Sequence, residues 1–254
     1  MKRITLAILS AALLSTSVNA QKGLEIAKAA DKADQGWGSS TVELEMTLKN
    51  KNGQVSKRSL SNKTLELSED GDKSLITFNS PADVKGTATL TYTHKVGPDD
   101  QWLYLPAIAR VKRISSSNKS GPFMGSEFAY EDLSSQEVEK YTYKFLEAKG
   151  SLLFVEQYPV DLKSGYKRRI ATYNKDKGYR IEKVVFYDRK NSKLKTLTYH
   201  DYKQYKGKYW RAGKMVMVNH QTNKETTLEF KGYDFERNFT DEDFSQNALK
   251  RAGN

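Results

Sequence analysis

The chain contains no cysteine, and it has only three histidines and five prolines among its 254 residues. Without cysteine there is no thiol nucleophile and no disulfide, so stability depends on packing alone. The histidines, at positions 94, 200 and 220, lack the spacing of metal ligands, and no Gly-x-Ser-x-Gly motif is present. The sequence therefore predicts no catalytic residue, no metal site and no cofactor, and it disfavours an enzyme.

Long apolar runs are also missing. The longest apolar stretch, Ile4 to Leu14, is shorter than the roughly 20 residues that a membrane-spanning helix needs. It follows Lys2 and Arg3 and precedes the small residues Val18 and Ala20, a pattern typical of a cleaved secretory signal peptide. We expect residues 1–20 to be this signal and the mature chain, 21–254, to be periplasmic. Since Gln21 would follow the cut, we expect no lipid anchor on the protein itself.

The net charge is +11, which falls to +9 when Lys2 and Arg3 are removed. A basic exported protein favours anionic partners such as lipid headgroups, and its export argues against nucleic acid. A surface of interspersed lysines and glutamates that binds nothing would give the same charge.

Periodicity predicts a mostly-β chain. Leu24 to Ala33 has the apolar spacing of one amphipathic helix, and Val42 to Leu48 alternates apolar and polar residues as a strand does. Turn signals such as Asn52-Gly53 separate similar stretches. Strands are predicted at 64–69, 73–78, 86–96, 101–105, 139–147, 152–160, 166–174, 179–187, 193–205, 214–219 and 226–233, with a short capped helix after Thr240.

Short connections between these strands favour antiparallel neighbours. A meander of about a dozen strands is expected to curl into a barrel or half-barrel within a single domain. One long interruption, residues 115–136, carries several aromatic side chains, and a connection of that length is usually functional or disordered. Its part from Phe123 to Leu133 is a candidate movable cover.

Large, soft apolar side chains recur on the predicted strands and in this interruption. An ordinary core would explain them, but so would a cavity too wide for its own side chains to fill, which suits an acyl chain. The hypothesis of a hydrophobic cavity assigns to its lining Met46, Leu75, Leu90, Tyr92, Trp102, Tyr104, Phe123, Met124, Phe128, Phe154, Tyr187, Tyr199, Met215, Met217 and Phe230.

A basic group follows the predicted strand at 101–105. Arg110, Lys112 and Arg113 suit a lipid phosphate or an acidic partner surface. Salt bridges to Glu127, Glu131 and Asp132 are the alternative.

Several motifs resemble the outer-membrane lipoprotein-sorting proteins, the LolA-like group. They are Phe78 to Thr87, Trp102-Leu103-Tyr104-Leu105-Pro106, Val111 to Ile114, Gly125 to Leu133 and Phe239 to Ser245. The resemblance covers most of the mature chain. It implies an unclosed antiparallel β-barrel with a few helices over its concave face and a hydrophobic cavity.

The resemblance further implies a periplasmic carrier for the acyl chains of a lipid or lipoprotein, with only peripheral membrane contact. It also implies a possible partner, an inner-membrane exporter of the resistance-nodulation-division type. A non-enzymatic accessory protein or envelope sensor with the same fold is the alternative.

Overall fold

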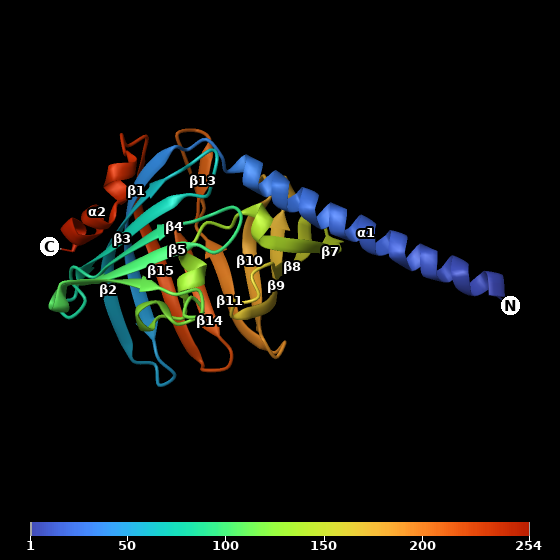
Figure 1. Ribbon diagram of the computed structural model, residues 1–254, viewed down its shortest axis with the longest axis horizontal. Coiled ribbons are helices and arrows are strands. Elements are labelled where there is room, and N and C mark those ends of the chain that lie inside the picture. The colour runs from blue at the N-terminus through green and yellow to red at the C-terminus, as the bar shows by residue number, and fades with distance from the viewer. Residues whose placement is uncertain (1, 254) are drawn as a thin grey trace.

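One antiparallel sheet of 13 strands forms most of the molecule; it curves strongly without closing into a barrel (Figure 1). The computed structural model describes residues 2–253, with side chains from residue 17 onward. The strands are β1 (Ser39–Lys49), β2 (Val55–Leu65), β3 (Lys73–Ser80), β4 (Ala88–Tyr92), β5 (Asp100–Leu105), β6 (Arg110–Ile114), β7 (Tyr141–Lys149), β8 (Leu152–Pro159), β9 (Tyr166–Asn174), β10 (Arg180–Asp188), β11 (Lys193–His200), β14 (Lys214–Asn219) and β15 (Lys224–Phe235). The predicted unclosed, mostly-β architecture is confirmed.

The strand order divides the sheet into two halves. From the middle of the sheet, β1 to β6 run in sequence to one edge, while β15, β14 and β11 to β7 run to the other. The pairing of β1 with β15 joins the halves. A separate hairpin, β12 (Lys203–Tyr205) and β13 (Tyr209–Arg211), extends between β11 and β14.

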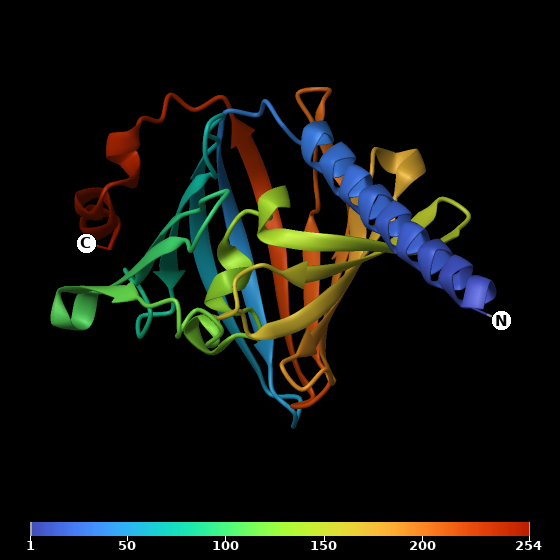
Figure 2. The ribbon, with the colours of Figure 1, turned by 45° about the vertical axis from the view of Figure 1, so that its right-hand side comes forward.

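This order places β6 and β7, which are consecutive in the chain, at opposite open edges of the sheet. The connection between them, residues 115–140, must therefore cross the space that the curved sheet surrounds. It contains only short 3-10 turns, η2 (Phe123–Gly125), η3 (Tyr130–Leu133) and η4 (Val138–Lys140). Figure 2 shows these turns lying within the curve of the sheet. We call residues 115–140 the plug.

Strand register determines which side chains share the inner face. Leu44 lies opposite Leu60, Leu60 lies opposite Phe78, and Met46 lies opposite Leu228 across β1 and β15. Because neighbours across an antiparallel pair point to the same side, these residues form one apolar surface. It belongs to the main core of the molecule.

Helix α1 (Lys2–Ala33) crosses the β7 edge, where Ile26 and Ala27 are buried. Gly23 permits this close approach, since a Cβ there would lie 2.9 Å from the backbone nitrogen of Phe145. The helix predicted to end at Ala33 does so. The proposed signal peptide forms the first part of α1; residue 1 and the side chains of 2–16 lie outside the described residues, so it stays a prediction.

The C-terminal segment covers the outer face of β3, β4 and β5. It consists of η6 (Asp241–Phe244) and α2 (Gln246–Ala252), the short helix that the sequence predicts, with Ser245 Oγ accepting a hydrogen bond from the Ala248 nitrogen at 3.1 Å. Phe244 and Leu249 are fully buried there. Two further turns are η1 (Pro106–Ile108) and η5 (Lys175–Lys177). Over residues 2–253, no helix combines the length and apolar character required to traverse a bilayer.

Candidate functional site

The inner face of the sheet is a wide apolar surface at the centre of the molecule. Met46 and Met217 are 2% and 0% exposed, so what covers them excludes water almost completely. Other buried members include Val42, Leu44, Leu60, Phe78, Leu153, Val155, Ala171, Val184, Phe186 and Leu197. Methionine and leucine side chains of this kind adapt to ligands of irregular shape.

The plug covers this surface with its own aromatic side chains. Phe123 is 1% exposed; its ring centroid lies 5.6 Å from that of Phe78 on β3 and 5.5 Å from that of Tyr130. Phe128 is buried beside them, and Met124 packs against the same core. The plug thus supplies apolar contacts to the centre of the inner face.

A buried ion pair holds the centre of the plug to β11. Lys195 Nζ lies 2.7 Å from Asp132 Oδ2, with the two side chains only 5% and 8% exposed. The same ammonium group donates to the Glu127 carbonyl at 2.8 Å, and the Tyr166 hydroxyl donates to Asp132 at 2.8 Å. Burial raises the pKa of Tyr166, so its hydroxyl remains protonated and continues to donate. Breaking one member of such a network leaves an uncompensated buried charge.

Further polar contacts fasten the plug on both sides of this pair. The Glu127 nitrogen donates to Thr226 Oγ1 at 3.0 Å, and its carboxylate accepts from Asn219 Nδ2 at 2.6 Å. On the other half of the sheet, the Arg58 guanidinium donates to the carbonyl of Met124. The plug is therefore an irregular segment that depends on side-chain hydrogen bonds, rather than on sheet pairing, to stay in place.

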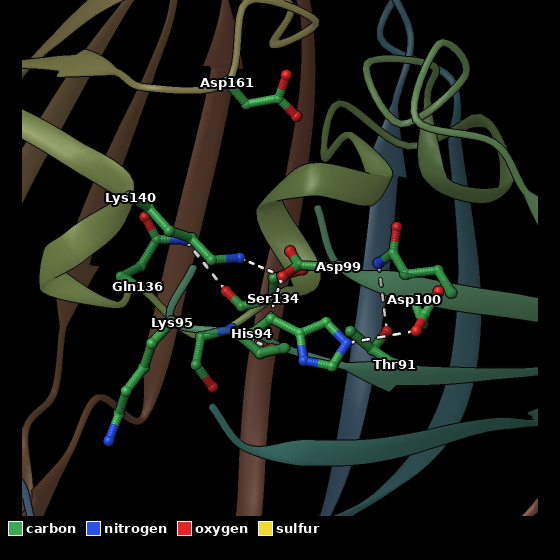
Figure 3. Close-up of polar contacts among 12 residues, drawn as sticks. Thr91, His94, Lys95, Asp99, Asp100, Ser134, Gln136, Lys140 and Asp161 are labelled. Carbon is green, nitrogen blue, oxygen red and sulfur yellow. Dashed lines mark hydrogen bonds and ion pairs between the residues drawn. The ribbon is translucent and has the colours of Figure 1, made fainter. Parts of the chain in front are cut away.

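A second polar cluster lies where the plug leaves the sheet, beyond the end of β4 (Figure 3). His94 Nδ1 lies 2.7 Å from Asp70 Oδ2, and its Nε2 lies 3.3 Å from Asp100 Oδ2. Partial burial lowers the pKa of His94, but these two hydrogen bonds outweigh it and raise the pKa overall. Lys140, at the end of the plug, forms an ion pair with Asp99, which lies in the turn between β4 and β5.

The hydrophobic cavity expected from the sequence stays a prediction, because the plug lies inside the curve and occupies part of that space (Figure 2). Two hollows lie away from the plug, one beside Asp234–Phe239 and one between Arg180, His200 and Trp210. Phe123 and Phe128 cover the part of the inner face around Phe78, whereas Tyr199, Met215, Leu228 and Phe230 of the same face are only partly buried. The segment predicted to cover the mouth of a cavity lies inside the curve because it must connect the two open edges.

This architecture is shared with proteins of known structure. A family model described as an uncharacterized protein matches residues 70–251, more than two thirds of the chain. The crystal structure of an outer membrane lipoprotein-sorting protein domain from Vibrio parahaemolyticus is 53% identical, with a TM-score of 0.89, and the match covers 92% of this chain and 100% of that one. The chain belongs to the outer membrane lipoprotein-sorting protein family.

Two further solved structures share the fold of this chain. A DUF1329 family protein from Desulfovibrio piger is 26% identical, with a TM-score of 0.83 over 91% of this chain and 99% of that one. A LolA superfamily protein from Nitrosomonas europaea shares the fold at 19% identity, with a TM-score of 0.71 over 91% of this chain and 99% of that one. No curated protein sequence matches the chain.

The residues predicted to line one cavity fall on both faces of the sheet. Those on the inner face or in the plug are Met46, Phe123, Met124, Phe128, Tyr199, Met215, Met217 and Phe230. Those on the outer face are Leu75, Leu90, Tyr92, Trp102, Tyr104, Phe154 and Tyr187. The expectation that all of them share one face is therefore wrong.

The outer group has its own partners. Leu75, Leu90 and Tyr104 pack against the C-terminal segment, and the Tyr92 hydroxyl donates to the carbonyl of Phe244 at 2.5 Å. Trp102 packs edge-on against Tyr92, Phe154 faces Lys149, and Tyr187 stacks on Arg168. These residues support the outer wall, not the surface beneath the plug.

The predicted basic group occupies the edge strand β6. Lys112 lies opposite Leu103 and Arg113 opposite Trp102, so they point to opposite faces. Arg113 pairs with Asp100, not with the three acidic residues of the plug that the sequence offers as alternatives. Arg110 and Lys112 are exposed beside it. The group is not gathered around one site, and its contact with a headgroup or partner stays a prediction.

Sequence analysis did not select Lys195 and Tyr166. A signal for Lys195 was present, because it alternates with Leu197 and Tyr199 on the apolar side of its strand. A lysine at an inward position requires a buried partner. Asp132, the partner, was considered only as a possible contact of the basic group.

Proposed function

We propose that this protein is a periplasmic carrier that binds the acyl chains of a lipid or lipoprotein on the inner face of its sheet, for transfer toward the outer membrane. The observation behind the proposal is the plug. A wide apolar surface is covered by a segment without strands or long helices, held through polar side-chain contacts that can be remade. Such a cover can be replaced by a ligand of similar character.

The energetic requirement is modest. A buried methylene contributes roughly 0.8 kcal/mol, so a sixteen-carbon chain contributes about 12 kcal/mol before the costs of binding. Displacing the plug would expose Phe123 and Phe128 and break the contacts of Lys195, which offsets part of that gain. Binding that is favourable but reversible is what a carrier between two membranes needs, and it requires no catalytic residue.

The absence of native cysteine provides a direct test, since an introduced pair has no competing thiols. The Glu127 nitrogen lies 3.0 Å from Thr226 Oγ1, so cysteines at these two positions would join the plug to β15. In the double variant Glu127→Cys with Thr226→Cys, we expect the oxidised protein to bind a fluorescent sixteen-carbon fatty acid more than about tenfold more weakly than the reduced protein.

The reduced form of the same variant is the matched control, because it differs only in the disulfide. Equal uptake in both redox states would show that the acyl chain does not replace the plug. No uptake by the unmodified protein, together with no amphiphile in organic extracts of it by mass spectrometry, would contradict the carrier role itself.

The position of the plug inside the curve (Figure 2) favours a second candidate, an accessory or sensor protein that binds protein partners with the plug in place. An inner-membrane exporter of the resistance-nodulation-division type is the partner that the family resemblance implies. This candidate predicts that the oxidised double variant retains its partners in envelope extracts while neither redox form takes up the acyl probe.

A further inference from the structure

The connection between β8 and β9, residues 160–165, exposes apolar side chains to water. Leu162 is 96% exposed and Val160 is 57% exposed. A leucine side chain that is solvated almost completely contributes nothing to packing in the isolated molecule. We call residues 160–165 the β8–β9 loop. In Figure 2 the yellow strands that the loop connects lie beside the yellow-green turns of the plug.

The loop is held in a defined conformation. Asp161 Oδ2 lies 2.7 Å from Lys119 Nζ, and Asp161 Oδ1 accepts from the Lys163 nitrogen at 2.8 Å. Glu131 accepts from the hydroxyl of Ser164 at 2.8 Å and from the nitrogen of residue 165 at 2.9 Å. Leu162 therefore lies at the tip of a turn whose conformation is held by these contacts.

Basic side chains surround this tip. The Arg189 guanidinium donates to the carbonyl of Lys163 at 2.9 Å and to that of Ser164 at 3.0 Å, which brings the turn after β10 against the loop. Lys163, Arg189 and Lys190 are all exposed. Among the residues the structure describes, none of the three forms an ion pair, whereas the nearby Asp161 is neutralised by Lys119.

Other exposed apolar side chains lack this setting. Val96 is 82% exposed, but its turn carries Asp99 and Asp100 and contacts Asp70. Ile108, in the turn before β6, is only 52% exposed, about half the exposure of Leu162. The β8–β9 loop joins Leu162, the most exposed of the large apolar side chains in the described part of the chain, to three exposed cations without ion-pair partners, a combination that suits an anionic bilayer surface.

We propose that the β8–β9 loop is a membrane-docking surface, with Leu162 and Val160 entering the boundary between headgroups and acyl chains while Lys163, Arg189 and Lys190 contact lipid phosphates. The inference deepens the carrier proposal and rests on it for the purpose of docking. The loop is bonded to the plug through Lys119 and Glu131, so docking acts on the same segment that covers the acyl-binding face.

The test is co-sedimentation of the full-length mature protein with vesicles of phosphatidylethanolamine and phosphatidylglycerol, compared with phosphatidylcholine vesicles. We expect binding to the anionic vesicles that weakens with added salt. Leu162→Ser should weaken it about tenfold, since one large apolar side chain leaves the boundary region. Lys163→Gln combined with Lys190→Gln should remove the preference for anionic lipid. Val96→Ser is the matched control and should leave binding unchanged.

Three results would overturn the inference: no binding of the unmodified protein, unaltered binding of Leu162→Ser, or an equal loss in Val96→Ser. Acyl-probe uptake, measured without vesicles, separates the two proposals. Leu162→Ser should take up the probe normally. If the unmodified protein took up no probe but bound vesicles through Leu162, the carrier role would fail and the docking surface would stand.

Discussion

Two carboxyl groups at the end of the plug are held in surroundings that disfavour their charge. Burial, together with the charges of Asp72 and Asp31, raises the pKa of Glu137 to about 7 against the opposing effect of Lys140 and Lys95. Burial likewise raises the pKa of Asp72 to about 6. Both folded-state values lie above those of the unfolded chain, so the folded protein binds more protons between about pH 4 and pH 7. Its stability therefore falls as the pH rises through that window.

Glu137→Gln should remove much of this dependence. At pH 8 we expect the free energy of unfolding to rise by about 1 kcal/mol, less than the full pKa shift implies, because water reaches part of the side chain. At pH 5 the variant and the unmodified protein should be nearly equal, since Glu137 is protonated there. Urea denaturation at pH 5, 6, 7 and 8 measures the difference. Glu139→Gln, an exposed neighbour, should show no such trend, and a parallel response in both variants would refute the assignment to Glu137.

The C-terminal helix α2 is predicted to stabilise the outer wall without touching the acyl-binding face. Leu249 is fully buried against Leu75 and Leu90, so Leu249→Ala should lower the free energy of unfolding by about 2–4 kcal/mol. Acyl-probe affinity, measured well below the melting temperature, should remain unchanged. Lys250→Ala, on the exposed side of the same helix, is the control. A loss of probe affinity in Leu249→Ala with the fold intact would mean that the outer wall takes part in binding.

Most helices and strands could be predicted from the sequence. Which side of the sheet each side chain points to could not. Strands β9 and β14 begin and end where alternation and turn residues predict, whereas β6 was missed because Arg-Val-Lys-Arg-Ile carries charge on both sides. In β4, four of five residues are buried, the inner side by the plug and the outer side by α2. When both faces are covered, alternation no longer identifies the inner one, so Leu90 and Trp102 were assigned to the wrong side.

At the scale of the whole molecule, the plug follows from the topology. The pairing of β1 with β15 leaves β6 and β7 at the two open edges, and the chain has to pass between them. A closed meander would need only a short hairpin at that point. The sequence showed a long aromatic connection, yet its position inside the curve depends on a pairing between distant strands that no local pattern reveals.

The molecule should therefore open by moving the plug while the sheet stays intact. Lys195→Met removes the charge that pairs with Asp132 while keeping an apolar stem of similar length against the sheet. Leaving the carboxylate buried without its partner should cost about 3 kcal/mol, and the part of the molecule that can relieve this cost is the plug. We expect faster hydrogen exchange over residues 115–136 and faster uptake of the acyl probe, with β1 and β15 still protected.

Lys193→Met on the same strand is the control, because Lys193 is exposed. It should leave both rates unchanged. If hydrogen exchange in Lys195→Met increased equally in the sheet and in residues 115–136, the ion pair would stabilise the whole fold and not the cover alone. If exchange increased in the plug without faster uptake, opening would not limit acyl binding. Faster uptake confined to the variant with a loosened plug would tie the carrier role to the movement of this one segment.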